Sequence, residues 1–260
     1  MRRFIITMAV TVAVTVSAVA VAAAVGGGSS ITRARLERAV PVVFANQYAR
    51  QAALLGHHDI TAASIDAKAM CDKHGPDVPD VGPGSDWVCL MSWNDPNVPM
   101  PNEGYGKFEL SVANTNCFTV GGPSKLVGFA TITDVDGHDV ANPVAEFDGC
   151  FDPVGDNTPT GVTFPSLLGV PSTVVSVTAD GSVSVQLTCG TGAEGCGGSV
   201  AAAATGDRAL GTVPYALRAE HGALVTFPEP LPPDATDVTL TFTPQTGVAP
   251  VKPVTVKVQG

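Results

Sequence analysis

The sequence has few charged and few aromatic residues, and it contains no run of lysine or arginine. Charged side chains make up 15% of the 260 residues, and aromatic side chains make up 6%. Of the 14 basic side chains, Arg2 and Arg3 lie in the N-terminal segment, which leaves 12 basic against 24 acidic side chains in the rest of the chain. An acidic surface repels phosphate backbones, so nucleic acid is excluded as a partner.

The motifs of common catalytic sites are also missing. The sequence has no G-x-S-x-G, no H-E-x-x-H and no pair of cysteines spaced as C-x-x-C. We therefore expect no catalytic residue, no cofactor and a non-enzymatic role. The alternative is a hydrolase or accessory protein for cell-wall polymer, with Glu146, Asp148 or Asp134 as acid and base beside an aromatic subsite.

A long apolar segment stands at the N-terminus. Residues 4–25 contain no charge, proline or glycine, and Arg2 and Arg3 precede them. An apolar helix of this length spans a bilayer, and the positive flank favours a cytoplasmic N-terminus with the rest of the chain outside. The alternative is a cleaved signal peptide ending at small residues such as Ala18-Val19-Ala20. Either interpretation predicts an extracytoplasmic protein: membrane-anchored through residues 4–25 in the first case and secreted in the second.

The six cysteines are an even number in a chain predicted to be exported, so we expect disulfides. Pairing in sequence order closes each loop inside one stretch of chain, and it gives Cys71 with Cys89, Cys117 with Cys150, and Cys189 with Cys196. Zinc is not expected, because Cys71, His74 and Cys89 have no fourth ligand. We interpret TCGTGAEGC, Thr188 to Cys196, as a staple across one strand-to-strand loop, unlike an antibody cystine that joins two sheets.

The pattern of apolar residues divides the chain into three parts: residues 1–30 as anchor or signal segment, 31–155 as an α+β domain, and 162–260 as an all-β domain. Spacings of three and four within residues 31–56 predict a helix over residues 42–55 with a looser helical stem before it, with Pro41 breaking or restarting the helix and Gly56 as C-cap. Alternation then predicts strands at residues 63–71, 86–93, 106–112, 126–135 and 142–150, with a helix as the alternative for 63–71 because of its alanine content. A helix laid on an antiparallel sheet is the expected architecture.

Short alternating strands follow from residue 162 to the end: TVVSVTA, SVSVQLTC, GSVAAAA, VPYALRA, ALVTF, DVTLTFT and KPVTVKVQ. A turn every 8 to 12 residues is typical of a β-sandwich. The motifs VQLTC, CGGSVAAA, LGTVPYAL, HGALVTF, DVTLTFTP and VKPVTVKV resemble small immunoglobulin-like modules of exported proteins in high-GC Gram-positive bacteria. The resemblance implies an envelope scaffold. The first half, with GSDWVC and EFDGCFD, is similar to uncharacterised membrane-tethered α+β domains.

Two further candidate sites come from side-chain clusters. Asp134, Asp136 and Asp139 in DVDGHD offer carboxylates to calcium, although a plain type I′ turn centred on Asp136-Gly137 explains the same residues. Trp87, Trp93 and Tyr105 offer a platform for binding, with burial in the core as the alternative. The predicted function is binding, adhesion or scaffolding, with the membrane, cell-wall polymer or another envelope protein as partner.

Overall fold

The computed structural model describes residues 29–258, of which those from Ile31 onwards belong to one compact unit. The predicted membrane segment, residues 4–25, lies outside the described residues. Within residues 29–258, no helix is long and apolar enough to cross a membrane.

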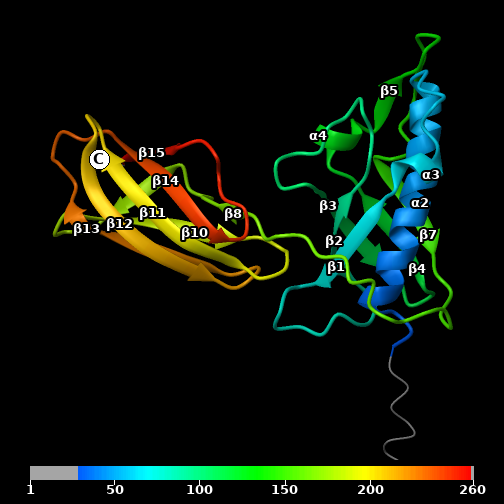
Figure 1. The fold of residues 1–260 in the computed structure, drawn as a ribbon, viewed down its shortest axis with the longest axis horizontal. Helices are drawn as coiled ribbons and strands as arrows, with labels where there is room; N and C mark the ends of the chain where they lie inside the picture. Colours follow the sequence, from blue (N-terminus) through cyan, green and yellow to red (C-terminus); the bar gives the residue numbers. More distant parts are fainter. Residues whose placement is uncertain (1–28, 259–260) are drawn as a thin grey trace, which may run out of the picture. The chain divides into compact units, whose positions relative to one another are not determined.

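One long helix, α2 (Arg33–Leu54), dominates the first half of the chain (Figure 1). It buries Leu36, Val40, Phe44 and Tyr48 along one face. Its end is closed by a Schellman motif, in which the N–H groups of Gly56 and His57 donate to the carbonyls of Ala53 and Ala52 at 3.1 and 2.8 Å. Gly56 has a φ of +88°, which confirms the predicted glycine cap.

The predicted break at Pro41 is wrong, because the helix runs through it without interruption. A proline in a helix interior removes one backbone hydrogen bond and costs about 3 kcal/mol. Four large side chains on one face are fully or almost fully buried against the sheet, and each contributes about 1.5–3 kcal/mol. Burial of the continuous face therefore outweighs the local cost of the proline.

Helix α2 lies across one face of a five-stranded antiparallel sheet (Figure 1). The spatial order is β1-β2-β3-β4-β7. The strands are β1 (Lys68–Lys73), β2 (Gly84–Ser92), β3 (Gly106–Val112), β4 (Cys117–Gly121) and β7 (Glu146–Cys150). Residues facing α2 alternate along the strands and form one core with it, whereas the other face of β3, β4 and β7 is polar and mostly exposed.

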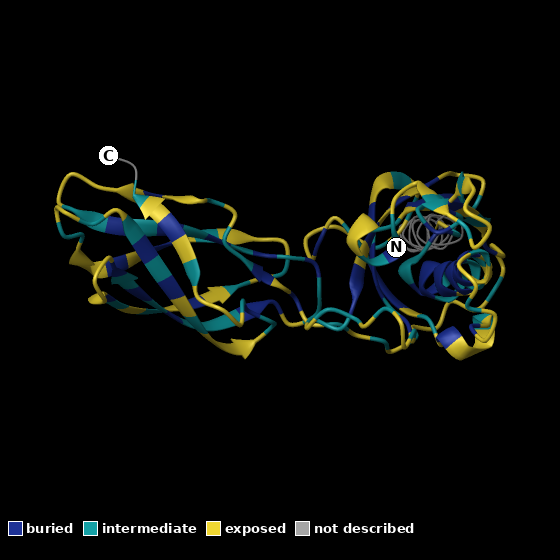
Figure 2. Cartoon of the chain, turned by 90° about the horizontal axis from the view of Figure 1, so that it is seen from above, coloured by how far each residue is buried: buried dark blue, intermediate teal, exposed yellow. Residues whose placement is uncertain are grey.

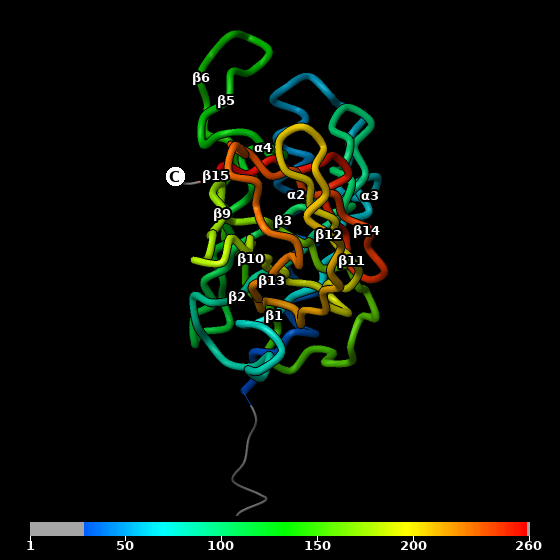
Figure 3. Tube along the Cα trace, turned by 90° about the vertical axis from the view of Figure 1, so that its left-hand side faces the viewer, coloured from blue at the N-terminus to red at the C-terminus, as the bar shows by residue number. Residues whose placement is uncertain are grey.

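Shorter elements connect these strands, and two predictions fail there. The shorter elements are α3 (Ala62–Ile65), α4 (Ser124–Val127), β5 (Thr131–Thr133) and β6 (Asp139–Ala141). The predicted strand over residues 63–71 begins only at Lys68, because Thr61 caps a helical turn before it. The predicted strand over 126–135 is reduced to β5, whose hairpin with β6 stands out at one end of the sheet (Figure 3).

The second half contains eight strands, which include all seven predicted there. They are β8 (Leu168–Gly169), β9 (Val174–Val177), β10 (Ser182–Cys189), β11 (Cys196–Ala204), β12 (Arg208–Leu217), β13 (Gly222–Pro230), β14 (Asp237–Thr246) and β15 (Val254–Val258). The order is β12-β11-β14-β15-β9-β10-β13, with β8 beside β10. Among the strand pairs within the described residues 168–258, β9–β15 is the parallel one and the others are antiparallel. Buried and exposed residues alternate along these strands (Figure 2), and the buried ones form a single core.

The two halves have separate hydrophobic cores, one within residues 31–151 and one within 168–256. The connection between them is bonded to α2. Glu37, whose side chain is 2% exposed, accepts hydrogen bonds from Arg33, from the N–H of Cys71 and from Thr160 at 2.6, 3.1 and 2.8 Å. Their independence as domains, 31–155 and 162–260, stays a prediction, because residues 31–260 cluster as one compact unit.

Candidate binding site

The three predicted disulfides are confirmed, and the chain has no free cysteine. Cys71–Cys89 joins directly opposed residues of β1 and β2, and Cys117–Cys150 does the same for β4 and β7. Disulfides persist in oxidising surroundings and are rare in reducing ones, so they indicate an extracellular or secreted protein.

The third disulfide, Cys189–Cys196, closes the predicted loop and also links strands that do not pair with each other. Cys189 ends β10 and Cys196 begins β11, which confirms a staple across a strand-to-strand loop. These strands are not neighbours in the strand order: β10 pairs with β9 and β13, whereas β11 pairs with β12 and β14, and the β9–β15 pair links these two groups. The disulfide therefore also ties the two groups together, at one end of the common core.

The aromatic residues proposed as a platform do not form one. Trp87, Trp93 and Tyr105 are only 1%, 3% and 5% exposed. Trp93 packs against Phe44 with ring centroids 4.9 Å apart, beneath α2. Tyr105 donates a hydrogen bond to the carbonyl of Pro165 at 2.7 Å, and burial raises its pKa to about 12. Core packing accounts for all three, and the hydrolase alternative loses its aromatic subsite.

The aspartates of the β5–β6 turn adopt a different arrangement from the one predicted. Asp134 accepts hydrogen bonds from the N–H groups of Asp136 and His138, and Gly137 alone in the turn has a positive φ, +83°. The turn is thus type I with a bulge glycine, rather than type I′. Asp139 bonds to Thr133, so the side chains that meet are Asp134, Asp136 and His138. An imidazole is not a calcium ligand, which weakens the calcium hypothesis.

The paired carboxylates Glu146 and Asp148 lie on the polar face of the sheet, as the alternation predicted, and both are exposed. Asp148 accepts a hydrogen bond from Thr119 at 2.5 Å. A glycosidase holds its two carboxylates across a substrate cleft. This pair lies instead side by side on one strand.

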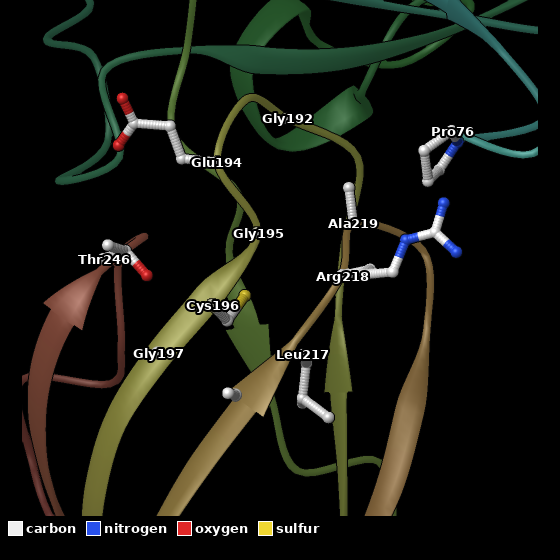
Figure 4. A pocket seen from close by; sticks show the side chains of 11 residues that line it. Pro76, Gly192, Glu194, Gly195, Cys196, Gly197, Leu217, Arg218, Ala219 and Thr246 are labelled. Atoms are coloured by element: carbon white, nitrogen blue, oxygen red, sulfur yellow. The ribbon is translucent and has the colours of Figure 1, made fainter.

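A pocket of about 430 Å³ lies where the loops at one end of the second half meet (Figure 4). Its walls come from the β10–β11 loop, the turn between β12 and β13, the last residue of β14, and Pro76. The side chains of Cys196 and Leu217 lie at its base, Glu194 and Thr246 on one side, and Arg218 and Ala219 on the other.

Backbone geometry keeps this pocket open. Gly195 has a φ of +69°, and a Cβ atom there would come within 2.3 Å of the carbonyl oxygen of Leu217. A side chain at this position is disfavoured by the backbone conformation and excluded by space. The adjoining Glu194 also has a positive φ, +69°, and it directs its carboxylate to the rim. The disulfide at Cys196 holds the loop at its other end.

The positive charge at the rim is paired. Arg218 contacts Asp77 at 2.7 Å, and His221 lies 3.1 Å from the same carboxylate. Hydrogen bonding to Arg218 lowers the pKa of Asp77 below its usual range. Nearby, Thr191 donates a hydrogen bond to Glu220. Burial raises the pKa of Asp72, and the negative charge of Glu220 raises it further.

The lining favours binding over catalysis. Glycine backbone, Ala216, Leu217, Ala219 and the disulfide make most of the surface, and the charged side chains are Glu194 and Arg218. Such a surface offers apolar contact, backbone hydrogen bonds and one charge of each sign, the usual features of a recognition site. Sequence reasoning missed the pocket, because only the fold brings these loops together. Its one local signal was the pair of glycines, Gly192 and Gly195, on either side of Ala193-Glu194.

No family model and no curated protein matches the chain. Among solved structures, a similarity is found to a protein described as a "Ca2+-stabilized adhesin" that "helps an Antarctic bacterium reach out and bind ice". The identity is 16%, and the match covers 75% of this chain and 43% of the other, so this chain spans less than half of that length. The TM-score of 0.19 is too low to carry an argument.

Proposed function

We propose that the protein is a non-enzymatic binding protein of the cell envelope, with an adhesion or scaffold role. The proposal rests on the loop pocket of Figure 4. The Cys189–Cys196 disulfide closes the β10–β11 loop that forms part of its wall, and its lining offers apolar side chains, backbone groups and charges for binding. The confirmed disulfides support an extracytoplasmic location. Anchoring through residues 4–25 is part of the proposal.

We infer in addition that the second half is an immunoglobulin-like sandwich. Its strands β9, β10 and β13 correspond in order to the first, second and fifth strands of that fold, and β11, β14 and β15 to the third, sixth and seventh. The fourth strand, β12, pairs with β11, whereas an antibody constant domain places it beside the fifth. Sandwiches of this kind gather loops at their ends and use them for binding, which supports the role assigned to the pocket.

Site-specific crosslinking tests the proposal. Ala216 and Ala209 are both exposed and lie near opposite ends of β12, but only Ala216 lines the pocket. A photoreactive amino acid replacing either residue is introduced into the full chain in its native envelope. We expect a discrete crosslinked product, cell-wall polymer or envelope protein, from position 216 and little from position 209.

Equal products from the two positions, or none from position 216, would contradict a pocket-centred binding role. Steady release of soluble fragments from cell-wall polymer by the purified chain would contradict the non-enzymatic assignment.

A further inference from the structure

The outer edge of β7 has unsatisfied backbone hydrogen-bonding groups. The ladder between β4 and β7 is fixed at its ends by the N–H of Phe151 donating to Asn116 and the N–H of Gly122 donating to Ala145, at 3.0 and 2.9 Å. In an antiparallel pair, bonded and non-bonded residues alternate. The intervening residues Glu146, Asp148 and Cys150 therefore direct their N–H and C=O groups away from β4.

No described residue accepts from these three N–H groups or donates to these three carbonyls. All three residues are exposed. The outward row therefore offers three donors and three acceptors at the spacing of a β-ladder, and an extended chain can pair with it.

The opposite edge of the same sheet is closed. On β1, the outward N–H of Cys71 donates to the Glu37 carboxylate at 3.1 Å, and that of Lys73 donates to Asp80 at 2.7 Å. Natural sheets block their edges in such ways, because an open edge templates pairing with another chain. The contrast within one sheet makes the open edge at β7 a specific feature of this molecule.

The surroundings of β7 define which segment fits. On the polar face, Glu146 and Asp148 are exposed, and Glu109 of β3 lies on the same face, across Gly121 of β4 from Glu146. On the opposite side, a hollow of about 300 Å³ next to α2 is lined by apolar side chains, which include Val42, 62% exposed, and by charged ones, which include Arg38 and Asp156, paired at 3.1 Å. Side chains of an added strand alternate between these two sides.

Pairing of β7 with a second copy is disfavoured by charge. An antiparallel β7–β7 pair centred on Asp148 would place this carboxylate opposite itself, and like charges directly opposed destabilise a strand pair. The formal net charge of −10 adds repulsion between copies. The favoured occupant therefore carries positive charge.

From this geometry, we propose that the outer edge of β7 is a docking site for an extended segment of a partner protein in which basic and apolar residues alternate. The segment adds a sixth strand, with basic side chains over Glu146 and Asp148 and apolar ones over Val42. The inference goes beyond the proposed function and does not depend on the loop pocket.

The test uses the full chain and a fluorescein-labelled eight-residue peptide of alternating lysine and valine, followed by fluorescence anisotropy. Asp148→Pro removes one outward N–H while leaving the ladder to β4 intact, since proline is tolerated where the N–H faces away. Asp148→Asn removes the charge and keeps that N–H and the acceptor for Thr119. We expect binding to the wild type, a loss of a few-fold for Asp148→Asn, and a loss of about tenfold or more for Asp148→Pro.

Hydrogen exchange on the wild type provides a second measurement that needs no variant. The peptide should slow exchange at Glu146, Asp148 and Cys150, and leave Cys71 and Lys73 unchanged. Several results would overturn the proposal: no binding by the wild type, equal binding of a glutamate–valine peptide, undiminished binding by folded Asp148→Pro, or protection confined to other strands. The proposal would also be overturned if the free wild-type chain were a dimer and Asp148→Pro converted it to a monomer, because β7 would then pair with a second copy.

Discussion

At the scale of single residues, one phenylalanine holds the first core together. Phe44 is fully buried on α2, and its ring lies 4.9 to 6.2 Å, centroid to centroid, from four other aromatic rings. Those rings come from α2 itself, from β3 and β7, and from Trp93 just beyond the end of β2. Aromatic pairs at these separations contribute beyond the area that they bury.

Replacing Phe44 by alanine should therefore destabilise the protein strongly. Core Phe→Ala substitutions cost about 3–5 kcal/mol, because contacts are lost and a cavity remains. Val42→Ala is the matched control, two positions away on the same helix and 62% exposed, and it should change stability by less than about 0.5 kcal/mol. Urea unfolding followed by tryptophan fluorescence measures both. Similar losses for the two variants would contradict the packing described here.

The residue scale also shows what sequence patterns can identify. Trp87, Cys89, Met91 and Trp93 share one face of the predicted strand, and all four are buried as alternation indicates. Glu37 could not be identified in this way. Its burial depends on three partners from α2, β1 and the connection between the halves, which only the folded chain brings to one place.

At the scale of elements, the disulfides differ in accessibility. Cys71 and Cys89 are both fully buried, and Cys189 and Cys196 are each 2% exposed. Cys117 and Cys150, in contrast, lie at the surface of the sheet, and Cys150 is exposed. Thiol–disulfide exchange requires a thiolate to reach a sulfur atom, so access controls the rate in the folded state.

Mild reduction of the folded protein should open the Cys117–Cys150 bond first. A brief treatment with dithiothreitol, then alkylation and peptide mapping by mass spectrometry, should label these two cysteines while the other four remain paired. The same treatment in urea, where all sulfur atoms are accessible, serves as the control and should label all six. Early labelling of Cys71 or Cys89 without urea would show that the burial around β1 and β2 is wrong.

Elements could be predicted where a local pattern determines them, and not where packing does. Seven strands of the second half follow from alternation, and the Gly56 cap follows from its position. The helix through Pro41 could not be predicted, because burial of a whole face overrides the local cost. Strand β4 was missed as a short segment between turns, and its place in the sheet depends on pairing with β3 and β7.

At the scale of the whole molecule, the strand order creates the candidate sites. The pocket exists because loops far apart in sequence meet at one end of the second half, and the open edge exists because β7 is the last strand of its sheet. Neither feature can be read from composition or spacing. In contrast, the sequence did predict the cysteine pairing. Two of the predicted bonds join paired strands, and the third joins the end of β10 to the start of β11, the next strand along the chain.

A count of free thiols tests whether this is an exported protein whose fold is held together by three disulfides. The full chain is taken from its native envelope, denatured without reductant and treated with a maleimide, and its mass is then measured. We expect no labelled cysteine before reduction and six after it. Two or more labelled cysteines in the unreduced protein would contradict this expectation.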